Sequence, residues 1–228
     1  MPSRTRNQIR RKPERGSYDF ERAAEIIDEA LVCHVGVVRD GSPVVLPMVH
    51  ARDGRRLYLH ASPAAGLARD GRRGEEMCVT FTIVDGLVLA RSGRSHSLNY
   101  RSAVVFGAAQ RVTDDVEKRR ALAAFVEHAT PGRWEQLRPM TEREVREVDV
   151  LALDLDELSV KVRSGPPLDN DEDRALPIWA GVLPVGLVAT GAPLADAGVP
   201  EGLAVPEHVG AWPAPAAAQA AGFVARPS

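Results

Sequence analysis

Three short, largely apolar segments separated by tight turns occupy residues 31–61, and this pattern constrains the fold more than any other feature. The segments are Leu31–Val38, Pro43–Ala51 and Arg56–Ala61. Asp40-Gly41, between the first two, is a strong hairpin signal because both residue types tolerate the positive φ of a type I′ turn. The chain is therefore predicted to form consecutive short strands here.

The same kind of segment recurs further along the chain. Met77–Ala90 is predicted as one long strand or as a hairpin about Asp85-Gly86. Three more predicted strands are Ser102–Val112, Val150–Leu155 and Ser159–Val162. Many short strands with few helices are typical of a barrel, so the predicted class is mainly β with flanking helices.

Helices are predicted between these strands. Their residue ranges are 20–31, 64–70, 114–129 and 141–148. Asp19 is placed to cap the first, and Pro63 suits the first position of the second. Thr141 and Glu144 have capping-box spacing at the start of the last.

The predicted strand Pro43–Ala51 is apolar on both of its faces. Residues 44, 46 and 48 alternate with residues 45, 47 and 49, and both sets are apolar. A barrel interior on one side and a subunit interface on the other would cover both faces.

Composition divides the chain into three parts. Residues 1–16 hold six basic residues and one acid and are predicted to be a flexible arm. Residues 17–185 form the predicted folded domain, and residues 186–228 form a tail rich in Ala, Pro and Gly. Because Trp179 would be unusual in a solvated linker, we expect residues 175–190 to pack on the body or on a partner chain.

Charge and composition exclude several classes of protein. The net charge is −2, which does not favour nucleic-acid binding. No apolar run approaches the roughly 20 residues needed to span a bilayer, and no secretory signal is evident. Cys33 and Cys78 lie outside any CxxC motif, which fits a reduced protein in the cytoplasm.

Several ordered segments, between about residues 15 and 185, carry a resemblance to a known family. They are Cys33–Val37, Leu57–Ala64, Cys78–Thr80, Asp85–Ser92, Ser95–Ser102, Pro131–Trp134, Lys161–Pro167 and Trp179–Gly181. Together they resemble the pyridoxamine 5′-phosphate oxidase-related, FMN-binding split-barrel proteins, especially the branch with nitroimidazole-resistance proteins. The resemblance implies a homodimeric split β-barrel with FMN in each of two clefts at the subunit interface.

The resemblance also implies where the cofactor lies. Val45, Leu46 and Pro47 would run along the isoalloxazine ring, and His60 and Ser62 would meet the ribityl phosphate. Ser95–Ser102, which includes Asn99, would come near the ring. Further residues that could reach the flavin or an anionic substrate are Lys161, Arg163 and Trp179.

The phosphate site departs from the family pattern. A flavin phosphate needs N–H groups, hydroxyls and one or two basic side chains. Ala65-Gly66 stands where relatives commonly carry a Ser-Arg pair. Nearby arginines that could substitute are Arg69, Arg72 and Arg73 in sequence, with Arg94 and Arg101 from elsewhere.

His96 and Arg101 are the candidate catalytic residues. They belong to a polar segment between two apolar strands, and such a segment is costly to bury without partners or a ligand. His96 could act as an acid or base near neutral pH, or could only hold its loop. The histidines show no metal-ligand spacing, so no dedicated metal site is predicted, although haem needs only one histidine.

These observations leave three functions open. The first is an FMN-dependent oxidoreductase acting on a nitro compound, a small heterocycle or a biosynthetic intermediate. The second is a non-catalytic flavin, deazaflavin or haem binding protein, and the third is a cofactor-free enzyme using His96. Pyridoxamine 5′-phosphate oxidation itself is disfavoured, because the C-terminal Arg-Leu-His-Asp-Arg type motif has no counterpart here.

Overall fold

The computed structural model describes residues 6–61 and 66–212 of the 228-residue chain. The strands are β1 Gly16–Ser17, β2 Cys33–Arg39, β3 Ser42–Met48, β4 His50–Asp53, β5 Arg56–Ala61, β6 Glu76–Leu89, β7 Ser97–Ala108, β8 Gln110–Arg111, β9 Asp149–Asp154, β10 Glu157–Arg163 and β11 Gly181–Pro184. The helices are α1 Phe20–Glu29, α2 Gly66–Arg72, α3 Asp115–Ala129, α4 Glu142–Arg146, α5 Asp171–Arg174 and α6 Glu207–Gly210, with 3₁₀ turns η1 Pro13–Arg15 and η2 Trp134–Gln136.

The strands form two antiparallel sheets. A 7-stranded sheet has the order β1-β10-β7-β6-β2-β3, with β11 paired to β6, and a 4-stranded sheet has the order β4-β5-β9-β8. The prediction of a mainly β fold with flanking helices is confirmed. No helix within residues 6–61 and 66–212 is long and apolar enough to cross a membrane.

The chain folds into two compact units. The first unit contains the residues up to Thr82 together with Ser102–Lys161. The second contains Ile83–Arg101 together with the chain from Val162 onward.

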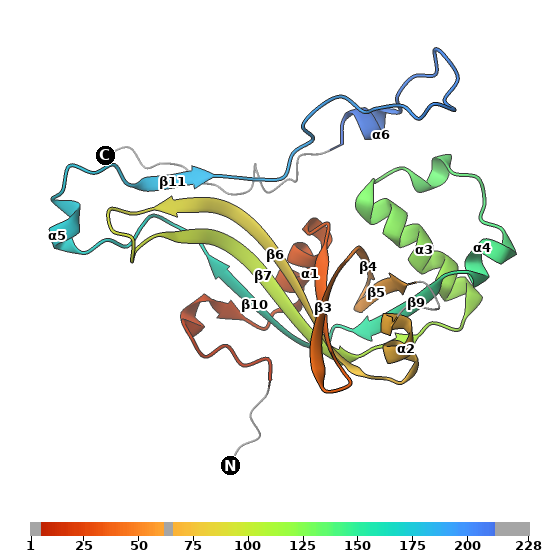
Figure 1. The fold of residues 1–228 in the computed structure, drawn as a ribbon, viewed down its shortest axis with the longest axis horizontal. Helices are drawn as coiled ribbons and strands as arrows, with labels where there is room; N and C mark the ends of the chain where they lie inside the picture. Colours follow the sequence, from red (N-terminus) through yellow and green to blue (C-terminus); the bar gives the residue numbers. More distant parts are fainter. Residues whose placement is uncertain (1–5, 62–65, 213–228) are drawn as a thin grey trace. The chain divides into compact units, whose positions relative to one another are not determined.

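In the first unit, α3 packs on one face of the 4-stranded sheet (Figure 1). Tyr58 and Val150, on paired strands, and Phe125 of α3 belong to the buried cluster between them. The helix predicted over residues 114–129 is confirmed, and Asp114 caps it, with its side chain accepting a hydrogen bond from the Glu117 N–H. This packing fixes β5 and β9, and the end of β5 lies opposite the start of β9, where Ala61 pairs with Asp149.

In the second unit, β11 lies antiparallel to the end of β6, with Gly181 opposite Leu89 and Pro184 opposite Gly86 (Figure 1). A Cβ at Gly86 would lie 2.9 Å from Cγ1 of Val182, so the glycine allows the close approach. Part of the expected packed segment 175–190 is therefore a strand of the sheet.

Two predicted strands differ from those observed, and a third matches one of its two predicted alternatives. Pro43–Ala51 is two strands, β3 and β4, in different sheets. Met77–Ala90 is one strand, without the alternative hairpin. The strand predicted from Ser102 begins at Ser97 and is followed by the separate β8, so the polar segment before Ser102 is largely strand.

Candidate functional site

Helix α2 follows β5 and organises the candidate site. It packs on β9 through Gly71, where an added Cβ would lie 2.6 Å from Cδ1 of the buried Leu151. Asp70 and Arg72, both on α2, each pair with residues from strands distant in sequence. Ser62, Ala65 and the predicted start of this helix at Ala64 lie outside the described residues.

On one side of α2, the guanidinium of Arg39 lies against Gly66. Nη2 of Arg39 donates to Oδ2 of Asp70 at 2.7 Å. A Cβ at Gly66 would lie 2.6 Å from Cζ and Nη2 of Arg39 and 2.8 Å from Nη1. Nε of Arg39 is buried without a hydrogen-bond partner in the described part of the chain. Arg39 closes β2 just before the Asp40-Gly41 turn, whose positive φ values of 50° and 76° confirm the hairpin signal.

On the other side, two arginines share the carboxylate of Asp149. Asp149 is fully buried and lies opposite Ala61, where β9 pairs with the end of β5. Arg72 Nη1 donates to one carboxylate oxygen at 2.7 Å, while Arg111 Nε and Nη2 reach the other at 2.9 and 2.7 Å. Lys118 is also buried, and desolvation lowers its pKa while the charge of Asp149 raises it. Both oxygens of Asp149 are thus occupied by protein donors.

His60 is the candidate site histidine at the end of β5. Its side chain is exposed, and the ring of Phe125 meets it edge-on with centroids 4.9 Å apart. Partial desolvation lowers the pKa of His60, which favours the neutral imidazole at pH 7.

His50 and His128 have structural roles instead. Their Nε2 atoms donate to the carbonyl oxygens of Ile27 and Ala30 at 2.8 and 2.9 Å. Burial lowers the pKa of His50 to about 4. His50 is therefore a buried strand residue, as expected, but only its Nε2 is satisfied, because Nδ1 is buried without a hydrogen-bond partner in the described part of the chain.

The β2–β3 hairpin presents an exposed face. Val45 and Pro47 of β3 pair with Gly36 and His34 of β2, and all but Gly36 are exposed. Leu46 points to the opposite face, where it pairs with the buried Val35. Within the chain itself, the predicted cofactor strand is therefore open on one face only.

The predicted site residues of the second unit are held in local contacts. Arg163 and Asn99 are buried and hydrogen-bonded to each other, and Arg163 also donates to the Gly165 and Pro166 carbonyls at 2.9 and 3.0 Å. Arg101 binds the carboxylate of Asp85 through Nε and Nη2, at 3.0 and 2.7 Å.

The other predicted residues lie in more open surroundings. His96 is exposed, and its Nδ1 lies 3.0 Å from the Ser92 carbonyl oxygen. Trp179 is 69% exposed and lies against Gly181. In the first unit, Lys161 donates through Nζ to the Arg11 carbonyl at 2.8 Å, and Arg69 is exposed on α2.

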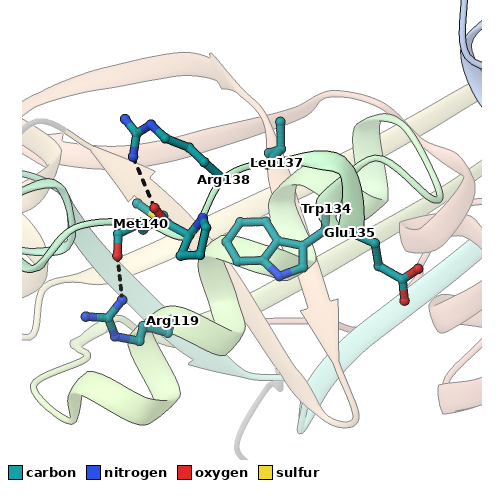
Figure 2. A pocket seen from close by; sticks show the side chains of 7 residues that line it. Arg119, Trp134, Glu135, Leu137, Arg138 and Met140 are labelled. Atoms are coloured by element: carbon teal, nitrogen blue, oxygen red, sulfur yellow. Dashed lines mark hydrogen bonds between the residues drawn. The ribbon is translucent and has the colours of Figure 1, made fainter.

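A shallow pocket of the first unit lies beside α3, as Figure 2 shows. Its lining residues are Arg119, Trp134, Glu135, Leu137, Arg138, Pro139 and Met140. The two arginines are neutralised by ion pairs with Glu142 and Glu144. The side chain of Glu127 accepts hydrogen bonds from the Gly132 and Trp134 N–H groups, both at 2.7 Å, and so fixes the adjoining turn. The segment Pro131–Trp134, one of those that carry the family resemblance, therefore has a structural role.

No group of three or more His, Cys, Asp or Glu side chains within residues 6–61 and 66–212 is arranged to hold a metal ion. The unpartnered Nε of Arg39, the exposed Arg69 and the exposed His60 are each of the donor type that a phosphorylated, planar ligand such as a flavin nucleotide requires. This fit defines a candidate cofactor site.

Comparison with known proteins places the chain in a family. A family model described as pyridoxamine 5′-phosphate oxidase matches residues 19–162. The chain therefore belongs to the pyridoxamine 5′-phosphate oxidase family, which confirms the resemblance. A search of curated proteins found no match.

Solved structures agree with this assignment. The flavocytochrome Anf3 from Azotobacter vinelandii is 36% identical, with a TM-score of 0.82 over 90% of this chain and 94% of that chain. A FAD and haem binding protein from Mycobacterium smegmatis is also 36% identical, with a TM-score of 0.81 over 86% and 95%. A proposed 5-nitroimidazole antibiotic resistance protein from Bacteroides thetaiotaomicron is 30% identical, with a TM-score of 0.55 over 64% and 86%.

Arg39, Asp149 and Arg111 were not among the residues predicted from the sequence, whereas Arg72, named there as a possible phosphate ligand, is bound to Asp149. The one local signal for Arg39 is its place at the end of an apolar strand, next to the Asp40-Gly41 turn. Its partner Asp70 is 31 residues away, so the pairing becomes visible only in the fold.

Proposed function

We propose that this protein is a flavin-dependent oxidoreductase that acts on a small organic substrate. The observation that carries the proposal is the 36% identity, over almost the whole length of both chains, to structures described as a flavocytochrome and as a FAD and haem binding protein. When bound, the flavin supplies the hydride or electron chemistry, and the protein supplies orientation and polar contacts.

The first unit provides side chains suited to this cofactor. Val45 and Pro47 offer an exposed apolar surface for the planar ring, and His60 offers a neutral imidazole. Arg69 adds a positive charge on α2. FMN is the flavin expected from the resemblance, and the FAD and haem binding protein from Mycobacterium smegmatis makes FAD the alternative to be tested beside it.

A nitro compound is the substrate class to test first, because one relative is described as a 5-nitroimidazole resistance protein. The experiment loads the protein with FMN or FAD, reduces it anaerobically with dithionite, and adds a 5-nitroimidazole. We expect the bound flavin to be reoxidised faster than the same concentration of free reduced flavin. Equal rates for bound and free flavin would reject nitro compounds as the substrate class, and a protein that binds neither flavin would reject the oxidoreductase proposal.

Haem is a second candidate ligand, supported by the same two relatives. An iron ligand must be a neutral imidazole with an available ring nitrogen. His60 meets this requirement, since it is exposed and forms no hydrogen bond within the described part of the chain. Titration with haemin should give a Soret shift that is lost in His60→Ala and retained in His34→Ala. A shift retained in His60→Ala would exclude His60 as the ligand.

The exposed face of β2 and β3 supports a homodimer with the cofactor clefts at its interface. Val38 and Val45 are 66% and 64% exposed, which is unfavourable for β-branched side chains left in water. Light scattering should give twice the chain mass of 24.6 kDa, and Val38→Glu should shift the protein towards the monomer. A monomeric wild-type protein would contradict the dimer.

A further inference from the structure

The space beside Gly66 is filled by an arginine from another element. Gly66 is the first residue of α2, and no side chain larger than hydrogen fits there while Arg39 keeps its position. The φ of Gly66 is not in the left-handed region, so its backbone does not itself require glycine. The guanidinium of Arg39 occupies the space that a side chain at position 66 would enter, and this end of a flexible side chain would have to move to admit one.

The guanidinium of Arg39 is held in place but is not saturated. Asp70, whose side chain is 9% exposed, accepts from Nη2 and orients the group. That contact is the single hydrogen bond of the guanidinium within residues 6–61 and 66–212, and Nε is buried without a partner. A buried unpaired donor is costly, and an absent ion or ligand is one of its ordinary explanations.

The charges around this guanidinium favour an anion. Arg69 is exposed on α2, three residues after Gly66 and so on the same helix face. Arg73 is exposed just after the last residue of α2, seven residues after Gly66. The opposing acids are Asp70, which is bound to Arg39, and Asp40 at the hairpin tip. A phosphate presents several acceptor oxygens and charge near −2, which matches the donors left on an arginine fork.

The Asp149 cluster is a poorer anion site. Its arginines are already bound to a fully buried carboxylate whose two oxygens are both occupied. Arg39 keeps a buried Nε without a partner and pairs with Asp70 alone, whereas Arg56, whose Nε is also unpartnered, pairs with both Glu117 and Asp154. The comparison favours Arg39.

We propose that Arg39 binds the phosphate of the flavin nucleotide, replacing from β2 the basic residue that a side chain at position 66 would otherwise supply. This proposal deepens the proposed function and rests on it. Gly66 and Arg39 then form a matched pair, because the absence of a side chain at one position makes room for the cation from the other. The shared chemistry is a flavin-linked phosphate, either the monophosphate of FMN or the pyrophosphate of FAD.

The test measures the affinity of the full-length apoprotein for FMN, FAD and riboflavin by flavin fluorescence titration. Arg39→Gln should weaken FMN binding by about ten- to a hundredfold, while riboflavin, which lacks a phosphate, should bind as before. An equal loss for FAD assigns the contact to the phosphate common to both nucleotides, whereas a loss for FMN alone assigns it to the terminal monophosphate. Arg143→Gln is the matched control, because Arg143 is an 82% exposed arginine paired with Glu147.

A second experiment moves the positive charge from position 39 to position 66. Arg39→Ala should bind FMN weakly, and adding Gly66→Arg should restore much of the affinity, because the obstructing guanidinium is gone. Thermal unfolding of each variant shows whether it is folded, and riboflavin binding shows whether the ring site is intact.

The outcomes separate the two proposals. Unchanged FMN affinity in a folded Arg39→Gln protein, or an equal loss of riboflavin affinity, would overturn the role of Arg39 and leave the proposed function standing. A wild-type protein that binds none of the three flavins would overturn the proposed function, and this inference with it.

Discussion

At the scale of single residues, the two sides of α2 use buried charge differently. Asp149 is fully buried and satisfied by Arg72 and Arg111, so it ties α2 and β8 to the end of β9. Arg39 keeps an unsatisfied donor beside Gly66. The first arrangement is suited to stability and the second to ligand binding.

Replacing the shared carboxylate should therefore destabilise the fold. We expect Asp149→Asn to lower the free energy of unfolding by roughly 2 kcal/mol. This is less than the cost of breaking a wholly buried ion pair, because the side chains of Arg72 and Arg111 are 37% and 44% exposed and can be hydrated once they lose the carboxylate. Urea denaturation measures the change. Asp156→Asn is the control, since its pair with Arg55 is exposed and should contribute little. Equal effects of the two substitutions would contradict this account.

The buried His50 should make stability depend on pH. Its folded pKa of about 4 lies below the ordinary value of 6.5, so the unfolded chain binds a proton that the folded chain does not. The resulting stabilisation is complete above about pH 6.5 and is lost as the pH falls towards 4, by roughly 3 kcal/mol. The neighbouring His128, whose pKa is also lowered, adds in the same direction, while the charge of Asp28 opposes it.

The measurement compares urea unfolding of wild type and His50→Gln between pH 7 and pH 4.5. The carboxylates titrate in both proteins, so the readout is the difference between the two curves. The difference in the free energy of unfolding between wild type and His50→Gln should narrow as the pH falls. A difference that stays constant with pH would show that His50 does not titrate as described.

Local residue signals were the most predictable part of this protein. The Thr141–Glu144 capping box and the cap Asp19 are confirmed, because each depends on residues three positions apart. The contact of Arg39 with Asp70 could not be predicted in the same way. It depends on how β2 and α2 meet, which no short pattern in the sequence encodes.

At the scale of elements, the apolar stretch after Asp40-Gly41 shows where periodicity fails. Alternation continues through Val49, but the chain changes sheets there, and His50 turns inward to bond Ile27. Similarly, the polar residues Asn99 and Arg101 suggested a loop, whereas they belong to β7 because Arg163 and Asp85 satisfy them. Such partners are distant in sequence and therefore invisible to a local pattern.

Helix α2 depends on close packing against β9. Gly71→Ala would place its Cβ 2.6 Å from Cδ1 of the buried Leu151, which is closer than the two carbon atoms can pack. We therefore expect overpacking to lower the free energy of unfolding by about 1–3 kcal/mol. Thermal unfolding measures it. Gly93→Ala is the control, because nothing lies within 4 Å of its added Cβ and its φ is not positive. A neutral Gly71→Ala would mean that α2 can move away from β9 without cost.

At the scale of the whole molecule, the family was predictable because several short segments recur in order along the chain, and the match over residues 19–162 confirms it. The cofactor contacts were less predictable. The resemblance named Ser62 and strand residues, whereas Arg39, which keeps a buried Nε without a partner and lies against Gly66, was not among them. A family pattern shows which residues usually act, but not which residue replaces one that is missing.

The most direct test of the proposal that this protein binds a flavin is the absorption spectrum of the purified protein after incubation with excess FMN or FAD and gel filtration. We expect the eluted protein to show flavin absorption bands, with about one bound flavin per chain. A Soret band appearing in addition would support the haem proposal. A colourless protein after reconstitution with either flavin would contradict the assignment as a flavin-dependent oxidoreductase.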